Sequence, residues 1–460
     1  MDRLRRAPRE HGLSEPLHAL TMNEIRKTPD NSASLSLPPE EQLLFRFSWA
    51  CKQFRENCEK NALAVDGHPV AWLIREIREM MSQYPETRFV QGLQALGVIR
   101  LPVMAQCVLY CLCERFLAKP LEPVDSLSFI SDEAQYAFRK GIDLLVGQGL
   151  AIAVAVNNSA ESKATKDNYL LAPEVCRLLF RGREDLIRPT VVAQFGSITA
   201  GRDIRERTLI FPEGLRDRLR LVSRAVAADQ FDRVVKELTE NGLRGGITVI
   251  LFGPPGTGKT EFVRQLALAS GRNLFLVDSA KLDASYFGEK PRNLRDFFRL
   301  VRYVQAISNL APIIFIDEAD ALLGRRVAVE KASDKEENTT ASVILEELNT
   351  FSGILFAATN FITTIDPAMY RRFLMKIEFP VPGRDVLAKI WRSKLPWITA
   401  EDAEALAARF PLSGGIIDNV AALCLLERII DGTSPTLDRI LRHCAEQGGK
   451  ERNNPIGFRH

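Results

Sequence analysis

The sequence predicts an α/β protein, with a parallel β-sheet in the second half of the chain and a mostly α-helical first half. Two observations predict the sheet. A β-branched run at residues 247–252 leads directly into a glycine-rich loop and a helix, and a buried strand at residues 312–316 ends in two acids. A third observation predicts the helical half, because apolar residues recur every three to four positions from Glu40 onward.

Composition and charge exclude several classes of protein. The chain has 460 residues, of which 46% are apolar and 26% are charged, which are globular values. With 61 Lys and Arg against 58 Asp and Glu, the net charge of +3 is too small to indicate a polyanionic partner. The apolar run at residues 103–113 is far shorter than the ~20 residues that span a bilayer, and no apolar stretch follows the basic N-terminus. We expect a cytoplasmic protein of several domains, with no membrane partner.

The eight cysteines and five histidines form no pattern typical of disulfides or zinc. A structural zinc site needs four convergent ligands at short spacings, and the sequence contains no CxxC pair. Three of the cysteines (Cys107, Cys111 and Cys113) lie in an apolar, helix-like stretch. We therefore expect buried thiols that act as small hydrophobic side chains in a reducing compartment.

The first half of the chain divides into a tail and an N-terminal domain. Residues 1–38 are rich in Arg, Ser, Pro and Asn and predict a disordered tail. Residues 39–190 predict a helical domain that ends in a helix from Ser131 to Gly147, a strand at 150–156, a polar loop at 157–168, a strand at 169–171 and a further helix. This order is typical of a winged helix.

Charge argues against DNA binding by that domain. The candidate recognition helix carries two basic residues, Arg139 and Lys140, against the three acids Asp132, Glu133 and Asp143. A helix that reads a DNA groove gains most of its affinity by neutralising phosphates. Protein recognition or a structural role is therefore favoured. Residues 191–241 predict a helical connector, with a strand-like stretch at 209–211 before a helix that begins near Pro212.

The glycine-rich loop is a phosphate-binding P-loop by its residues and by its position between a strand and a helix. Its glycines let successive backbone N–H groups converge on phosphates, at the positive end of the following helix. Lys259 places a charge at the β- and γ-phosphates, and the Thr260 hydroxyl ligates Mg²⁺. The loop consists of Gly253, Pro254, Pro255, Gly256, Thr257, Gly258, Lys259 and Thr260.

The two acids after the strand at 312–316 are the second element of the predicted site. Parallel strands end at one edge of a sheet, so Asp317 and Glu318 are expected to lie beside the P-loop. Asp317 is expected to hold the Mg²⁺ from its second shell, and Glu318 to polarise the attacking water.

Four segments together resemble the AAA+ ATPases, and within them the AAA-type protein-remodelling members. They are the P-loop, Ile-Asp-Glu-Ala-Asp at 316–320, Ala-Thr-Asn at 358–360, and Asp-Pro-Ala-Met-Tyr-Arg-Arg-Phe at 366–373. The resemblance covers about residues 208–445. It implies a nucleotide-binding domain with a parallel five-stranded sheet at 242–382, a small α-helical lid at 383–446 and a tail at 447–460.

The resemblance also implies roles for further residues. Asn360 matches the residue that orients the water with Glu318. Arg371 and Arg372 match the arginine finger, which reaches the site of a neighbouring subunit, and the sequence leaves open which of them does so. Tyr286 and Phe287 match the pore loop that grips an extended polypeptide. In the lid, Asp418 stands where many members have an arginine that faces the γ-phosphate, so phosphate sensing by the lid is in question.

The sequence therefore favours a motor that binds ATP and Mg²⁺, hydrolyses ATP, and remodels or threads a protein client through a homo-oligomeric ring, with a hexamer as the family norm. Two alternatives stay open. One is a DNA-associated ATPase that uses the winged helix, and the other is a scaffold whose assembly is switched by nucleotide. The client and the pathway are not evident from the sequence.

Overall fold

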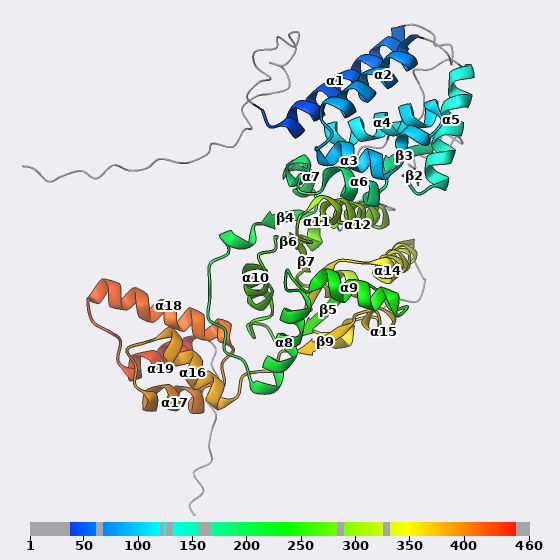
Figure 1. Ribbon diagram of the computed structural model, residues 1–460. Helices are drawn as coiled ribbons and strands as arrows, with labels where there is room; N and C mark the ends of the chain where they lie inside the picture. Colours follow the sequence, from blue (N-terminus) through cyan, green and yellow to red (C-terminus); the bar gives the residue numbers. More distant parts are fainter. Residues whose placement is uncertain are drawn as a thin grey trace, which may run out of the picture. The chain divides into compact units, whose positions relative to one another are not determined.

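The computed structural model describes residues 37–60, 68–119, 124–125, 132–155, 167–187, 189–282, 289–324 and 332–447 (Figure 1). The chain divides into two compact units. The first comprises Met1–Leu117 and Val124–Tyr169, and the second comprises Ala118–Pro123 and Leu170–His460. Among the described residues, no helix is both long and apolar enough to cross a membrane.

The first unit is mainly helical, as the apolar periodicity predicts. Its core contains Phe47, whose ring lies edge-on to those of Phe89 and Tyr110, with centroids 4.7 and 6.0 Å apart. Its elements are the helices α1 (Pro39–Lys60), α2 (His68–Gln83), α3 (Arg88–Ala95), α4 (Val103–Ala118) and α5 (Asp132–Gly147), the 3₁₀ turn η3 (Val98–Arg100), and a sheet of order β1-β3-β2 formed by Val124–Asp125, Asp167–Leu171 and Ala151–Ala155. The boundary between the units falls within β3, after Tyr169.

The cysteines behave as predicted. All eight are free and buried, and five of them lie on α1 and α4. Burial raises the pKa of the Cys107 thiol to about 12, so this thiol stays protonated and unreactive near neutral pH. The side chains therefore serve packing in this helical core.

The predicted winged helix is described only in part. The order α5, β2, β3 and α6 (Pro173–Phe180) follows the expected helix, strand, strand and helix. Most of the predicted wing at 157–168 lies outside the described residues. The sequence placed α6 in the N-terminal domain, whereas it packs against α12 (Glu289–Ile307) of the second unit, because its apolar face is buried there. The winged-helix interpretation stays a prediction.

The second unit is built on a six-stranded sheet of order β4-β6-β7-β8-β5-β9. Five strands are parallel, as predicted, and their register is continuous from β6 to β9. The strands are β4 (Gly196–Thr199), β5 (Ile247–Phe252), β6 (Leu274–Val277), β7 (Ile313–Ile316), β8 (Ile354–Thr359) and β9 (Met375–Glu378).

The sixth strand, β4, adds an antiparallel edge strand to the five predicted parallel strands, and it lies within the predicted helical connector at 191–241. It is a four-residue edge strand that runs antiparallel to β6, and its last three residues are exposed, so it lacks the apolar alternation that marks a strand in sequence. A Cβ at Gly196 would lie 2.1 Å from the carbonyl oxygen of Leu276, so only glycine permits this approach. The strand-like stretch at 209–211 is not a strand, although Leu209 and Phe211 pack against the core.

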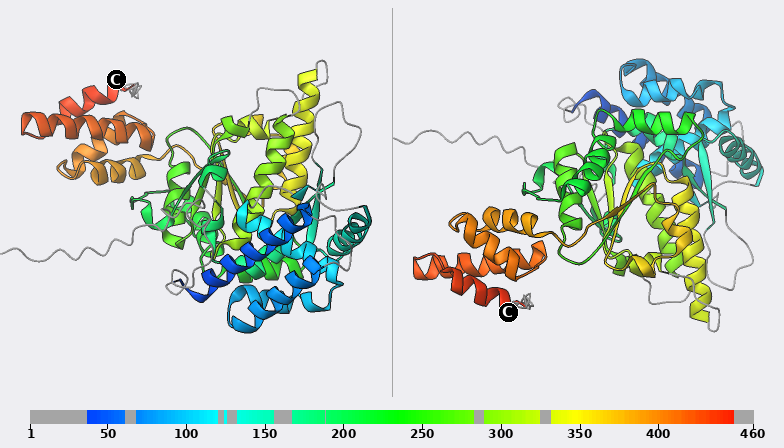
Figure 2. Two further views of the ribbon diagram at one scale, coloured as in Figure 1. Left: turned by 90° about the horizontal axis from the view of Figure 1, so that it is seen from above. Right: turned by 90° about the horizontal axis from the view of Figure 1, so that it is seen from below.

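Helices cover both faces of the sheet because strand side chains alternate between them. Val249 and Leu251 of β5 pack with residues of α8 and α10, whereas α12 and α14 run alongside each other on the opposite side (Figure 2). The remaining elements before the lid are the helices α7 (Pro189–Val192), α8 (Glu213–Ala225), α9 (Phe231–Glu240), α10 (Lys259–Ser270), α11 (Ser279–Leu282), α13 (Asp320–Leu323), α14 (Ala332–Thr350) and α15 (Pro367–Tyr370), and the 3₁₀ turns η4 (Glu184–Leu186), η5 (Gly201–Asp203) and η6 (Ile362–Thr364).

The lid is α-helical, as predicted, and consists of four helices around the fully buried Trp391. A capping box formed by Thr399 and Asp402 fixes the start of its second helix. The four helices are α16 (Arg384–Lys394), α17 (Ala400–Arg409), α18 (Gly414–Asp431) and α19 (Leu437–Glu446).

A buried arginine joins three connections of the sheet domain. Arg272 is 1% exposed, and its guanidinium donates hydrogen bonds to the carbonyls of Val226, Ala227 and Ala311 at 2.8, 3.4 and 2.8 Å. It also lies over the ring of Phe231, 4.9 Å from the centroid. Burial lowers the pKa of Arg272, and these carbonyls compensate the desolvation of its charge.

Replacement of this arginine tests its role in stability. We expect Arg272→Met to lower the free energy of unfolding by about 3 kcal/mol, because the carbonyls of Val226 and Ala311 lose the guanidinium as a donor and the stacking on Phe231 is lost. Urea unfolding followed by circular dichroism measures the change. Arg202→Met is the control, since the side chain of Arg202 is 89% exposed and its removal should change little. Equal effects of the two substitutions would contradict the role assigned to Arg272.

Candidate nucleotide-binding site

The P-loop follows β5 and ends where α10 begins at Lys259. Its three glycines all have positive φ angles, of 139°, 74° and 97° for Gly253, Gly256 and Gly258. At Gly253 a Cβ would lie 2.2 Å from the carbonyl oxygen of Phe379, so a side chain there is excluded. The loop therefore turns tightly against the sheet and brings its N–H groups to the positive end of α10, which is a ready-made site for an anion.

Lys259 lies at the centre of the site and is only 7% exposed. Its Nζ donates to the carbonyls of Gly253 and Pro254, at 2.6 and 2.9 Å, and to Oδ1 of Asn360, at 2.8 Å. Burial lowers the pKa of Lys259, and the nearby Asp317 and Asp320 oppose this shift. An ammonium has three donors, so binding of a phosphate at Lys259 requires the exchange of at least one of these bonds.

Asp317 and Thr260 meet directly, as the order of the strands predicts. The Thr260 hydroxyl donates to Oδ2 of Asp317 at 2.8 Å, and the backbone N–H of Glu318 donates to Oδ1 at 3.0 Å. Both carboxylate oxygens of Asp317 are thus oriented. A hydroxyl beside a carboxylate suits the coordination of Mg²⁺, which prefers oxygen ligands and takes the rest from phosphates and water.

Glu318 is exposed at the mouth of the site and has a φ of 49°. Among the described residues, it is the one non-glycine residue with a positive φ. Such backbone strain, on the order of 1–3 kcal/mol, persists where the surrounding structure imposes it and is often found at functional sites. Glu318 and its neighbour Asp317 both line the pocket, and Asp317 bonds to Thr260.

The two candidate finger residues do not line the pocket, and their surroundings differ. Arg372 is partly buried, with its Nε 3.2 Å from Oδ1 of Asn349 and its Nη1 3.1 Å from the carbonyl oxygen of Ala368. Arg371 is exposed, and its guanidinium makes no hydrogen bond or ion pair to any residue that the structure describes. The pore-loop candidates Tyr286 and Phe287 lie outside the described residues.

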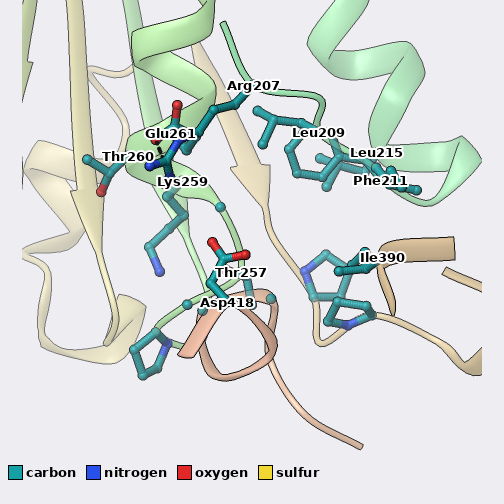
Figure 3. A pocket seen from close by; sticks show the side chains of 18 of the residues that line it. Arg207, Leu209, Phe211, Leu215, Thr257, Lys259, Thr260, Glu261, Ile390 and Asp418 are labelled. Carbon is teal, nitrogen blue, oxygen red and sulfur yellow. Dashed lines mark ion pairs between the residues drawn. The ribbon is translucent and has the colours of Figure 1, made fainter. Parts of the chain in front are cut away.

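The sequence did not reveal the apolar wall of the site. A pocket of about 390 Å³ extends from the P-loop to the segment before α8 and to the lid (Figure 3). Phe211 is fixed edge-on against Phe379 and Phe262, with ring centroids 5.5 and 6.4 Å apart. A flat aromatic base fits such a wall. The available signal was the apolar run at 209–211. The apolar lining residues are Leu209, Ile210, Phe211, Pro212, Leu215, Pro380, Pro382 and Ile390.

The lid reaches the P-loop through its own backbone. The N–H of Gly415 donates to the carbonyl oxygen of Gly256 at 3.0 Å. Asp418, the residue that departs from the family pattern, lines the same pocket and forms an ion pair of 2.6 Å with Lys394. The site thus contains residues from the sheet, from the segment before α8 and from the lid.

Metal binding by protein side chains alone is not indicated in the described ranges. They contain no group of three or more His, Cys, Asp or Glu side chains that could hold a metal ion. Thr260 and Asp317 are suited to an ion that arrives with a nucleotide and is ligated mainly by phosphate oxygens and water.

Comparison with known proteins agrees with this geometry. The family described as "ATPase family associated with various cellular activities (AAA)" matches residues 249–381. The 26S proteasome regulatory subunit 6B homolog of Aspergillus niger is 35% identical over 202 residues, which are 41% of this chain and 45% of that protein. The 26S proteasome regulatory subunit 6A of Saccharomyces cerevisiae is 35% identical over 167 residues, 35% of this chain and 37% of that protein.

An archaeal relative aligns over a longer stretch. The proteasome-activating nucleotidase of Aeropyrum pernix is 31% identical over 274 residues, which are 57% of this chain and 63% of that protein. The chain spans less than half of the length of the two 26S relatives named above. The matched region contains the P-loop, Asp317, Glu318 and Asn360, and with its lid it has the fold that those motifs predict. Through this domain, the chain is similar to the AAA family of ATPases.

Proposed function

We propose that the protein binds ATP with Mg²⁺ and hydrolyses it to remodel or thread a protein client. The observation that carries the proposal is the convergence of Lys259, Thr260, Asp317 and Asn360 at the ends of three adjacent parallel strands, with Glu318 exposed beside them. This arrangement supplies a phosphate-binding cation, an oriented metal ligand and a carboxylate that can accept a proton from water.

Each group has a distinct task in the proposed reaction. The P-loop N–H groups and Lys259 hold the phosphates, and Thr260 with Asp317 orients the metal, which when bound neutralises charge on the phosphates. Asn360 and Glu318 position the water, and Glu318 takes its proton. The apolar wall around Phe211 receives the base.

We also propose that the protein works as a homo-oligomeric ring, with six subunits as the expected number. The names of the relatives place them in or with the proteasome, which supports a protein client for this chain as well. No described feature favours DNA, and α5 has the acidic excess noted in the sequence. A cytoplasmic location, expected from the composition, stays a prediction.

Within this proposal, Arg371 is the arginine finger and Arg372 is structural. Arg371 is exposed and unpaired among the described residues, so it is available to the site of a neighbouring subunit. Arg372 uses its guanidinium within its own subunit, on Asn349 and Ala368. An arginine finger must extend from its own subunit toward the neighbouring one. Arg371 can do so without breaking side-chain hydrogen bonds within its own subunit, whereas Arg372 cannot.

Glu318→Gln tests the hydrolytic step. We expect ATP to bind with nearly unchanged affinity and the hydrolysis rate to fall by about 10²-fold or more, because the amide cannot accept the proton of the water. The measurement is phosphate release at saturating ATP. Glu378→Gln, at an exposed position on β9, is the matched control. Brisk hydrolysis by Glu318→Gln would contradict the assigned base.

Arg371→Ala and Arg372→Ala separate catalysis from structure. We expect Arg371→Ala to reduce hydrolysis by about 10³-fold without changing thermal stability. We expect Arg372→Ala to lower the melting temperature, because it removes two internal hydrogen bonds.

A mixing experiment tests whether Arg371 acts between subunits. Arg371→Ala subunits retain a complete pocket, and Glu318→Gln subunits retain Arg371. Co-assembly of these two inactive proteins should therefore restore hydrolysis. No recovery in mixed oligomers, although mixing is shown by cross-linking, would contradict the proposal.

Tyr286→Ala tests the threading part of the proposal. We expect ATP hydrolysis to continue while the unfolding of a protein client is lost, because the aromatic side chain is proposed to grip the polypeptide. The measurement compares phosphate release with the loss of fluorescence of an unfolding reporter. If Tyr286→Ala abolishes ATP binding instead, the loop supports the site and the pore interpretation fails.

A further inference from the structure

The pocket contains a lid cation that the P-loop mechanism does not use. Three cationic side chains line it: Lys259 of the P-loop, Arg207 and Lys394. Arg207 lies 3.7 Å from Glu261 in an ion pair at the first turn of α10. Lys394, at the last position of α16, is the one cation that the lid contributes to the described lining.

Lys394 is held by an acid that also faces the pocket. Its Nζ lies 2.6 Å from Oδ1 of Asp418, and the two side chains are 32% and 42% exposed, so solvent and a ligand can both reach the pair. Figure 3 shows Asp418 in the same pocket as Lys259 and Thr257. The backbone of the lid is fixed to the P-loop next to this pair, through Gly415 and Gly256.

Charge makes this pair sensitive to a polyphosphate. The lining contains three cationic residues against four acidic ones, Glu261, Asp317, Glu318 and Asp418. Glu261 is paired with Arg207, and Asp317 is oriented by Thr260. Asp418 is paired with Lys394. A bound polyphosphate would repel the carboxylate of Asp418 and attract the ammonium of Lys394.

We propose that Lys394 is the lid's phosphate-binding residue, and that Asp418 holds it when no γ-phosphate is present. This inference rests on the proposed binding of ATP. When ATP occupies the pocket, Lys394 leaves Asp418 and binds the γ-phosphate. ADP has no such phosphate and leaves the Lys394–Asp418 pair in place. Since Lys394 ends α16 and Asp418 lies in α18, the exchange links the number of phosphates to the packing of two lid helices.

Lys394 supplies the cation that the family pattern places at position 418, where this chain has Asp418. A carboxylate at the position of an arginine would by itself weaken the binding of phosphate by the lid. The structure supplies a cation from a different helix, 24 positions earlier in the sequence, and the carboxylate becomes its holder. The lid thus contributes a positively charged group to the pocket although none stands at the position of the family's arginine.

Nucleotide affinities test the exchange. Isothermal titration with ATP and with ADP, both with Mg²⁺, is carried out on full-length protein that carries Glu318→Gln to prevent hydrolysis. We expect Lys394→Met to weaken ATP binding about tenfold and ADP binding little, because only ATP gains the charged contact. Lys394→Arg should retain the preference for ATP.

Substitution of Asp418 should change the affinity for ATP in the opposite direction. We expect Asp418→Asn to tighten ATP binding severalfold, because Lys394 is released and a repelling charge is removed, and this gain should shrink in the double variant with Lys394→Met. Lys389→Met is the matched control, since Lys389 is exposed on the same helix and does not line the pocket. It should leave both affinities unchanged.

The outcomes separate this inference from the proposed function. If ATP binds to every protein and the ratio of ATP to ADP affinities is the same in Lys394→Met as in Lys389→Met, the pair is only structural and the inference is overturned. If Asp418→Asn weakens ATP binding, the holding role is overturned. If ATP binds to none of the proteins, including the control, the proposed function itself fails.

Discussion

The parallel pairing of β7, β8 and β5 is the constraint on which the site depends. Their register places Ile316 beside Ala357 and Phe252 beside Thr359, so the residues that follow these strands emerge together. Because β8 lies between the other two, Asn360 reaches Lys259, and the N–H of Ala319 bonds to the carbonyl oxygen of Ala358. Asp317, Asn360 and the P-loop each follow their strand directly, so they lie together at one edge of the sheet.

Around this rigid edge, the site is completed by parts that are less tightly constrained. The segment before α8 contributes Phe211 by packing alone, since it pairs with no strand. The lid contributes through one backbone hydrogen bond to Gly256 and through the Lys394–Asp418 pair. A ligand in the pocket can therefore contact the sheet edge, this segment and the lid at once.

Buried polar groups outside the site serve structure. Arg272 joins three connections of the sheet domain, and in the first unit Arg55 donates a hydrogen bond to Oε1 of the buried Glu114 and forms an ion pair with it. Burial raises the pKa of Glu114, and Arg55 opposes that shift. Such contacts fix one arrangement of neighbouring elements, because losing them would leave a buried charge without its hydrogen-bond or ion-pair partners.

The sequence by itself determined the P-loop, the strand that ends in Asp317 and Glu318, and the helical lid. These features depend on residue types at fixed short spacings, and local backbone preference expresses them directly. Only the tertiary structure decided the edge strand β4, the wall around Phe211, the different surroundings of Arg371 and Arg372, and the pairing of Lys394 with Asp418. Each depends on a contact between residues far apart in the chain, and neither the periodicity nor the composition of either partner carries that information.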